Sequence, residues 1–187
     1  MKLIYGVGLA QVTSSRKSRT FLLWTSMLSR CYRASEQKKP TYIGCEVSEN
    51  FKNYSFFESW CKDQIGYHNE GWEIDKDILS GFNKKYSEDS CVFVPKEINK
   101  FLTIRHRFRG DLPLGVDLRP KNGRFRSRIN LNGISVCLGH FSNKEDAFFA
   151  YKKEKEKQAK FIAEKWKDHI DPRAYEALMS YSVEITD

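Results

Sequence analysis

The stretch GVDLRPKNGRFRSRINL, residues 115–131, decides the fold of the C-terminal part of this chain. Arginine occupies every second position of its later half, and mostly apolar residues stand between. Successive side chains of a β-strand point to opposite faces, so this alternation predicts one cationic and one apolar face. The cationic face takes Arg124, Arg126, Arg128 and Asn130, and the apolar face takes Phe125, Ser127, Ile129 and Leu131.

The cationic face of this strand has two interpretations. Three guanidinium groups in a row repel one another unless an anion or solvent faces them. The phosphate backbone of a nucleic acid is such an anion, and Arg and Asn are also frequent readers of base edges. The alternative is a solvated outer face. The surrounding sequence favours nucleic acid.

The strand belongs to a predicted three-stranded sheet with one helix behind it. The strands cover about 114–119, 124–130 and 134–141, and Asn-Gly pairs at 122–123 and 132–133 separate them. Asn-Gly is a strong short hairpin signal. A capping box from Ser142 to Glu145 begins a helix that continues to Lys167. This helix would cover the apolar side of the sheet with Ala147, Ala150, Tyr151, Glu154, Phe161, Ile162 and Trp166.

The N-terminal part combines helices with a strand–loop–strand–helix pattern. Aromatic residues at helical spacing predict helices over about 19–33 and 51–65, and a short strand at 42–47 lies between them. Strands follow at about 71–79 and 91–95, and Pro95 suits the start of a short helix over 96–102. The predicted class is therefore α+β, with a helical and ββα part followed by a three-stranded antiparallel sheet packed on one helix.

These patterns divide the chain into four segments. Residues 1–104 form an N-terminal scaffold whose ββα core covers about 72–102. Residues 105–113 form a basic linker that includes Arg107. Residues 114–167 form the second domain, and 168–187 form a less basic tail with a short helix near 173–181.

Composition narrows the functional classes. The 187 residues carry a formal net charge of +8, which favours polyanionic partners. No apolar run approaches the roughly 20 residues of a membrane helix, and the first five residues are too short for a signal peptide. We therefore expect a cytoplasmic protein with no membrane partner. Five scattered cysteines without a C-x-x-C pair argue against structural zinc and favour buried thiols in a reducing compartment.

Residues 114–166 resemble the APETALA2-type DNA-binding domain. The matching features are Leu114-Gly115-Val116, the strand 124–129, the run 138–141 (LGHF) and the run 147–151 (AFFAY). In that family a three-stranded antiparallel sheet lies in the major groove, with one helix packed behind it. The resemblance implies double-stranded DNA as the partner. Its implied contacts are Arg119, Lys121, Arg124, Arg126 and Arg128, and Asn130 joins them because it shares the arginine side of the strand.

Residues 72–101 resemble the HNH, or ββα-metal, nuclease module of phage-type homing endonucleases. The matching text is the runs 74–77 (IDKD), 81–84 (GFNK) and 89–99. Segments before residue 46 look like small HNH proteins of short-tailed phages, which would place the protein in the host cell cytoplasm. In an HNH site an Asp or His at the end of the first strand binds a divalent metal, and the adjacent His activates water. Asp75 matches the ligand position.

Lys76 stands where the general-base His of an HNH site is expected. A lysine with a pKa near 10.4 is a poor base at neutral pH unless burial or nearby charge lowers the pKa. His68, seven residues before Asp75, is a candidate for the missing His. Tyr86 is a further candidate for proton transfer or phosphate contact.

The resemblance also implies a metal site formed by oxygen ligands near these groups. Asp77 and Asn83 would complete a site with Asp75 that suits Mg²⁺ or Mn²⁺. The alternative is that Asp75 and Asp77 cap a turn, while Lys84 and Lys85 contact backbone phosphate.

Two main functional hypotheses follow. The first is a homing or nicking endonuclease that hydrolyses phosphodiester bonds with a metal held by Asp75 and Asp77. Its catalytic set is Asp75, Lys76, Asn83 and His68, and its DNA-binding set includes Lys84 and Arg107. The second is a catalytically degenerate DNA-binding protein, regulatory or counter-defence, that keeps the HNH fold without cutting. A third hypothesis is an RNA-binding module, since basic sheets with aromatic residues also bind RNA.

Overall fold

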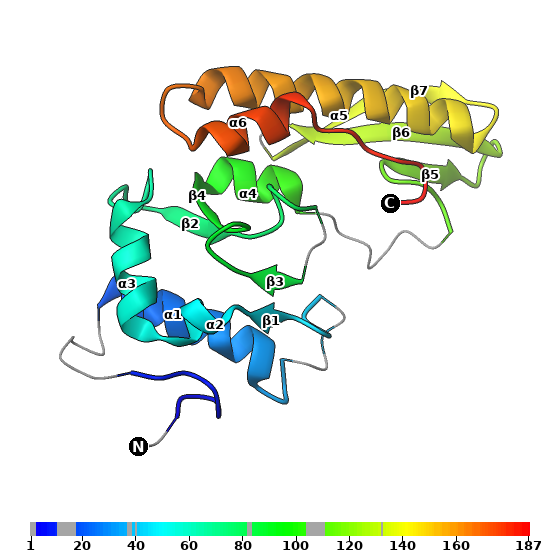
Figure 1. Ribbon diagram of the computed structural model, residues 1–187. Helices are drawn as coiled ribbons and strands as arrows, with labels where there is room; N and C mark the ends of the chain where they lie inside the picture. Colours follow the sequence, from blue (N-terminus) through cyan, green and yellow to red (C-terminus); the bar gives the residue numbers. More distant parts are fainter. Residues whose placement is uncertain are drawn as a thin grey trace. The chain divides into compact units, whose positions relative to one another are not determined.

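The computed structural model describes residues 3–10, 18–36, 39, 41–81, 84–103, 111–131 and 133–187. The chain divides into two compact units, shown in Figure 1. Unit 1 contains Met1–Lys100 and Asp168–Ala174, and unit 2 contains Phe101–Lys167 and Tyr175–Asp187. Most of the predicted linker 105–113 lies outside the described residues. The α+β class predicted from the sequence is confirmed.

Unit 1 is built on aromatic residues from its first three helices. α1 (Arg19–Tyr32) begins at Ser18, whose hydroxyl accepts a hydrogen bond from the N–H of Phe21, as N-cap serines commonly do. α2 (Glu49–Lys52) and α3 (Tyr54–Asp63) contribute further rings to the same core. The indole Nε1 of Trp24 donates to the carbonyl of Phe51 at 2.7 Å, so the largest buried side chain also has its polar atom satisfied.

Short strands complete unit 1 in two small sheets. β1 (Glu46–Val47) pairs in parallel with β3 (Lys85–Tyr86). β2 (Trp72–Asp75) pairs antiparallel with β4 (Val92–Pro95), and α4 (Lys96–Leu102) follows β4 directly. The strand–loop–strand–helix pattern predicted from the sequence is therefore present, with Asp75 at the end of β2.

Two expectations for unit 1 are corrected. The predicted strand 42–47 keeps only its last two residues, because residues 41–44 form turns. The predicted helix 51–65 is broken at Asn53, where α2 ends and α3 begins. The Asn53 side chain accepts hydrogen bonds from the N–H groups of Ser55 and Phe56. A side chain that caps a new helix in this way competes with continuation of the preceding one.

Unit 2 is a three-stranded antiparallel sheet with one long helix packed on it. β5 (Val116–Arg119), β6 (Arg124–Leu131) and β7 (Ile134–Phe141) pair in chain order. α5 (Lys144–Trp166) lies along β6 and β7 (Figure 1). The buried core between them is formed by Leu114, Val116, Ala147, Phe148 and Val183.

A glycine at the start of β5 allows the helix to approach the sheet. Gly115 has a φ of +71°, and a Cβ at this position would lie 2.1 Å from the ring of Tyr151. Both the left-handed backbone and the close ring favour glycine. The Leu114-Gly115-Val116 run thus marks the point where sheet and helix meet.

The structure corrects two details of α5. The N-cap is Asn143, one residue after the predicted Ser142, and its side chain accepts from the N–H of Asp146 at 2.7 Å. Phe161 is 63% exposed, although the predicted apolar face includes it. Thirteen residues at 3.6 per turn place Phe161 roughly 140° around the helix from buried Phe148. The buried residues of α5 are Ala147 and Ile162, which the predicted face includes, and Phe148, Ala159 and Ala163, which it does not.

The segment after α5 is divided between the two units. α6 (Pro172–Met179) corresponds to the short helix expected near residues 173–181. Beyond it Val183 is fully buried in the core of unit 2, and its carbonyl accepts from Lys152 Nζ at 2.5 Å. Among the described helices, none is long and apolar enough to cross a lipid bilayer.

Candidate nucleic-acid interface and HNH-like site

The outward side of the unit 2 sheet carries the arginines of β6. Along β6 the burial alternates as predicted: Ser127 and Ile129 are buried, whereas Arg124, Arg128 and Asn130 are exposed and Arg126 is half-buried. We call the outward side the arginine face. It comprises Asp117 and Arg119 of β5, Arg124, Arg126, Arg128 and Asn130 of β6, and His140 of β7.

An acidic side chain lies inside the arginine face. Asp117 pairs directly with Arg126 across β5 and β6. Arg126 Nη2 lies 2.9 Å from Asp117 Oδ2, and Arg128 Nε lies 2.8 Å from the same oxygen. The Asp117 carboxylate also raises the pKa of the Arg126 guanidinium. The anion that relieves repulsion between these two arginines is therefore supplied in part by the protein itself.

Asp117 is a residue of the interface that the sequence analysis did not single out. Strand alternation alone does not reveal this pairing, because it depends on the register, and the structure pairs Arg119 with Arg124. Counting two residues back along β5 and two forward along β6 places Asp117 opposite Arg126. Cross-strand pairs of opposite charge are a usual stabilising feature of antiparallel sheets.

The remaining predicted DNA contacts have varied environments. Arg119 and Lys121 are exposed around the first hairpin. Arg124 Nη2 donates to the carbonyl of His140 at 3.1 Å, which holds this side chain across β7. The side-chain oxygen of Asn130 accepts from the N–H of Gly133 at 2.8 Å, so this amide also supports the second hairpin.

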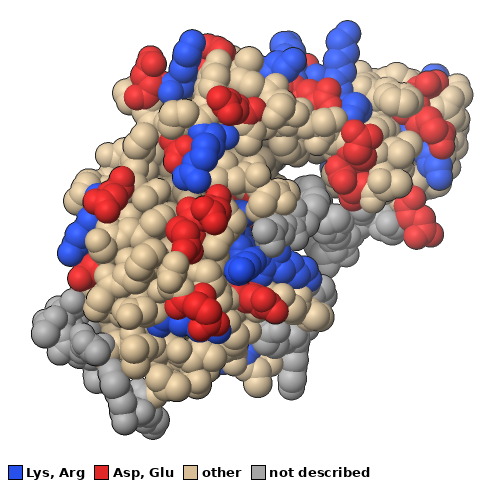
Figure 2. All heavy atoms as spheres, viewed as in Figure 1, with Lys and Arg blue, Asp and Glu red and all other residues tan. Residues whose placement is uncertain are grey.

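Charge is mixed on the visible surface. On the face shown in Figure 2, Lys and Arg atoms are interspersed with Asp and Glu atoms over both units. The described residues on this side therefore form no single basic patch. The order of the arginines along β6, rather than net charge, distinguishes the candidate interface.

Asp75 in unit 1 is a buried turn residue. Only 7% of its surface is exposed. Its Oδ1 accepts hydrogen bonds from the N–H of Asp77 at 2.9 Å and of Ile78 at 2.8 Å. Burial raises the pKa of the Asp75 carboxyl, while the two N–H donors oppose this rise. This geometry matches the turn-capping alternative.

Lys76 is buried beside Asp77 and Tyr86. Its exposed fraction is 7%, and its ammonium group pairs with Asp77 Oδ1. The ammonium nitrogen also lies 5.6 Å from the centre of the Tyr86 ring. Tyr86 is itself buried, and burial raises the pKa of its hydroxyl. At neutral pH this phenol stays protonated, in keeping with a residue of the core.

Two further candidate residues, His68 and Lys84, make contacts of their own. His68 is exposed and packs edge-on against the Tyr67 ring, with 4.8 Å between the ring centres. Lys84 Nζ donates to the carbonyl of Ile43 at 2.6 Å. Asn83 and Arg107 lie outside the described residues.

A divalent metal at Asp75 and Asp77 fits the described residues poorly. Asp75 uses Oδ1 to hold a turn, and Asp77 already faces the Lys76 ammonium. A bound cation would repel that buried ammonium. Within the ranges that the structure describes, no group of three or more His, Cys, Asp or Glu side chains is arranged to hold a metal ion.

The cysteines mostly behave as small buried residues. Cys31, Cys45, Cys61 and Cys91 are buried, and burial raises the pKa of Cys61 and Cys91 to about 12. Thiols with such pKa values are poor nucleophiles. Cys137 differs because it is exposed on β7, opposite Arg128.

Comparison of this chain with family models, with curated proteins and with solved structures gives no match.

Proposed function

We propose that the protein binds double-stranded DNA through the arginine face of unit 2. The observation that carries this proposal is the row of Arg124, Arg126 and Arg128 on one side of a strand whose other side is packed in a core. A rigid strand holds the guanidinium groups in fixed order, which suits contacts to phosphates and base edges. The resemblance to the APETALA2-type domain supports the same use of the sheet.

We further propose that unit 1 keeps an HNH-like ββα arrangement without cutting DNA through Asp75. The support is local. The Asp75 carboxylate is buried and holds a turn, and the position of the expected general base is occupied by a lysine that pairs with Asp77. These contacts favour the hypothesis of a degenerate nuclease module in a DNA-binding protein.

A second candidate function is metal-dependent DNA cleavage by unit 1. The observation that favours it is the order of β2, β4 and α4, which places Asp75 at the end of the first strand as the HNH resemblance implies. Both candidates share the arginine face as the DNA-binding surface.

The binding proposal is tested by titrating a labelled DNA duplex with the wild-type protein and with an Arg124→Gln/Arg128→Gln variant. We expect the variant to bind more weakly, and the slope of log K against log salt to fall by up to about 2. The matched control is Lys62→Gln/Lys144→Gln, which removes the same charge elsewhere. Equal losses in both variants would overturn the proposal. If the Arg124→Gln/Arg128→Gln variant lost binding to single-stranded RNA but kept its binding to duplex DNA, the RNA hypothesis would be favoured.

The cleavage question is tested on supercoiled plasmid with Mg²⁺ or Mn²⁺. We expect no nicking by the wild type or by Asp75→Asn, with circular dichroism to verify that the variant folds. Nicking by the wild type that Asp75→Asn abolishes would establish the second candidate instead. A gain of nicking in Lys76→His would show that unit 1 is a nuclease module altered at its general base.

A further inference from the structure

The side of α5 that faces away from the sheet carries a stripe of exposed lysines and phenylalanines. Phe149, Lys153, Lys157 and Phe161 follow one another at four-residue spacing, and Lys160 lies beside them. Phe149 is 59% exposed and Phe161 is 63% exposed. We call these five residues the α5 stripe. We propose that the α5 stripe binds single-stranded nucleic acid.

Packing within unit 2 does not explain why Phe149 and Phe161 are present on the surface. The neighbouring Phe148 is 1% exposed and fills the core of unit 2. Phe149 and Phe161 add no comparable burial, since most of each ring meets solvent. Exposed aromatic rings among lysines are the combination on which unpaired bases stack while phosphates meet the cations.

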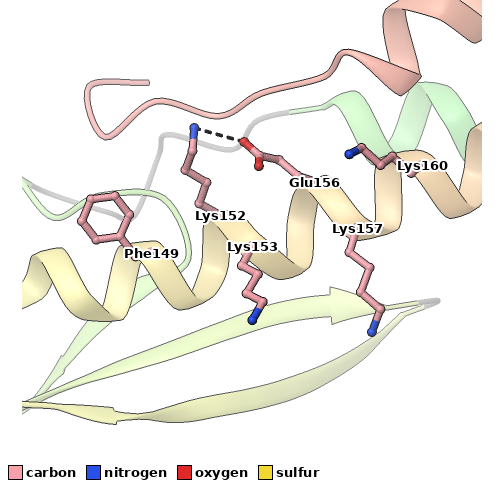
Figure 3. Close-up of a pocket in the computed structure, with 6 residues that line it drawn as sticks. All are labelled: Phe149, Lys152, Lys153, Glu156, Lys157 and Lys160. Atoms are coloured by element: carbon pink, nitrogen blue, oxygen red, sulfur yellow. Dashed lines mark ion pairs between the residues drawn. The ribbon is translucent and has the colours of Figure 1, made fainter.

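A shallow groove of about 520 Å³ runs beside the stripe. It is lined by Phe149, Lys152, Lys153, Glu156, Lys157 and Lys160, as drawn in Figure 3. Lys152 and Glu156 lie together with an ion pair between them, whereas Lys153 and Lys157 project from the helix in another direction (Figure 3). The groove therefore has two walls. The paired wall is formed by Lys152 and Glu156, and the cationic wall is formed by Lys153, Lys157 and Lys160.

The paired wall has a structural role in unit 2. Lys152 Nζ donates to the hydroxyl of Ser182 at 2.8 Å and to the carbonyl of Val183 at 2.5 Å. Glu156 lies 3.0 Å from the same ammonium. These contacts hold the C-terminal segment against α5 and leave the charges of this wall compensated.

The cationic wall has little internal compensation. Lys157 has a side chain that is 72% exposed and lies 3.6 Å from Glu154. Among the residues that the structure describes, Lys153 and Lys160 make no ion pair with an acidic side chain. Nearby Glu164 accepts a hydrogen bond from the hydroxyl of Tyr175 at 2.7 Å. An external anion would therefore find three lysines within two turns of helix.

The spacing of the stripe favours a single strand over other anionic partners. Four residues of α-helix advance about 6 Å, and the twelve residues from Phe149 to Phe161 span about 18 Å. A duplex hides its bases in the stack, so exposed rings gain nothing from it. A lipid surface requires a continuous apolar face, whereas here lysines separate the two rings. A strand with accessible bases and regularly spaced phosphates uses both kinds of side chain.

This inference is independent of the proposed DNA-binding function. The α5 stripe and the arginine face share no residue, and they lie on different elements of unit 2. Substitutions in one surface therefore test that surface alone.

The experiment measures fluorescence anisotropy of labelled oligothymidylate and oligouridylate of about 15 nucleotides with the full chain. We expect both strands to bind, because stacking and phosphate contacts do not require a 2′-hydroxyl. Phe149→Ala and Phe161→Ala should each weaken binding roughly fivefold or more. A Lys153→Gln/Lys157→Gln variant should lower the salt slope by about 1.4. Duplex binding should be unchanged in all three variants.

Matched controls separate stacking and charge from general effects. Ile134→Ala removes a similarly exposed apolar side chain from the β6–β7 hairpin, and Lys62→Gln/Lys144→Gln removes two lysines outside the α5 stripe. Neither should change single-strand binding by more than twofold. The proposal is overturned if single strands bind through Arg124 and Arg128 instead. It is also overturned if neither oligonucleotide binds, including the case in which the protein binds vesicles containing phosphatidylserine.

Discussion

The Asp117 carboxylate on β5 lies 2.9 Å from the Arg126 guanidinium on β6, and it contacts Arg128 from the same oxygen. Because the pair is partly exposed, its contribution to folding is on the order of 0–1 kcal/mol. If the arginine face binds DNA as proposed, phosphates would compete with this internal carboxylate for the two guanidinium groups. In that proposal Asp117 weakens the attraction of the arginine face for a polyanion.

Replacement of Asp117 by Asn should strengthen duplex binding. We expect the slope of log K against log salt to steepen by up to about 2, because two guanidinium groups become available to phosphates. Fluorescence anisotropy at several salt concentrations measures this slope. Asp111→Asn, at an exposed position outside the sheet, makes the same change of charge. An equal gain in both variants would assign the effect to net charge alone.

Lys155 should make the stability of unit 2 depend on pH. Its ammonium lies 3.5 Å from the centre of the Phe101 ring, and burial lowers the pKa of Lys155 from 10.5 to about 8. Between these values the unfolded chain binds more protons than the folded chain. The contribution of Lys155 to the free energy of unfolding should therefore rise as pH increases from about 8 to about 10.5, by at most about 1.4 kcal/mol per pH unit. The buried thiols of Cys61 and Cys91, whose pKa is raised to about 12, contribute in the opposite direction above pH 9, so the difference between the wild type and a Lys155 variant isolates this rise.

Urea denaturation at several pH values tests the role of Lys155. Lys155→Met should remove this rise in stability, whereas Lys160→Met, at an exposed position of the same helix, should retain it. A Lys155→Met variant with the pH dependence of the wild type would show that another group titrates.

Adjacent phenylalanines of α5 should differ sharply in their effect on stability. Phe148→Ala removes a ring that is 1% exposed from the core of unit 2 and should cost about 3–5 kcal/mol. Phe149→Ala removes a ring that is 59% exposed and should change stability by less than about 0.5 kcal/mol. Comparable losses in chemical denaturation would mean that the orientation of α5 is different.

The position of the α5 cap can be tested by two neighbouring substitutions. Asn143→Ala removes the acceptor for the Asp146 N–H and should destabilise unit 2 by about 1 kcal/mol. Ser142→Ala should have almost no effect on the denaturation midpoint. If Ser142→Ala destabilised the protein and Asn143→Ala did not, Ser142 would be the N-cap of α5.

Ser127 should be replaceable without loss of stability. Its hydroxyl oxygen is buried and, among the described residues, has no hydrogen-bond partner. Ser127→Ala should leave the free energy of unfolding unchanged or raise it by about 1 kcal/mol, because the desolvated hydroxyl is removed. Ser90→Ala should instead destabilise the protein, since the hydroxyl of buried Ser90 accepts from the N–H of Ser87 and donates to the carbonyl of Lys85.

Local signals in the sequence predicted most of unit 2. Alternation along residues 124–131 gave the strand and its two faces, and the glycines at 123 and 133 gave the hairpins. These signals depend on neighbouring residues only. The orientation of Phe161 was mispredicted because several phases of the helix bury aromatic residues equally well, and the sheet selects one of them.

The candidate sites were harder to predict because their chemistry depends on contacts between distant or alternative partners. The spacing of Asp117 and Arg126 becomes informative only once the strand register is known. The motif around Asp75 does not specify whether its carboxylate faces solvent or its own turn. In the structure the Asp75 carboxylate faces its own turn, where it accepts from the N–H groups of Asp77 and Ile78. The same short motif is equally compatible with a carboxylate that faces solvent.

The burial of Val183 beside Leu114 and Phe148 has a consequence for biosynthesis. The first strand of unit 2 is translated about 65 residues before the side chain that completes its core. A nascent chain on the ribosome therefore carries β5–β7 and α5 with an unfilled apolar surface until residue 183 has emerged. During that interval the growing polypeptide offers a binding surface to chaperones, and a pause in elongation before this valine would prolong it.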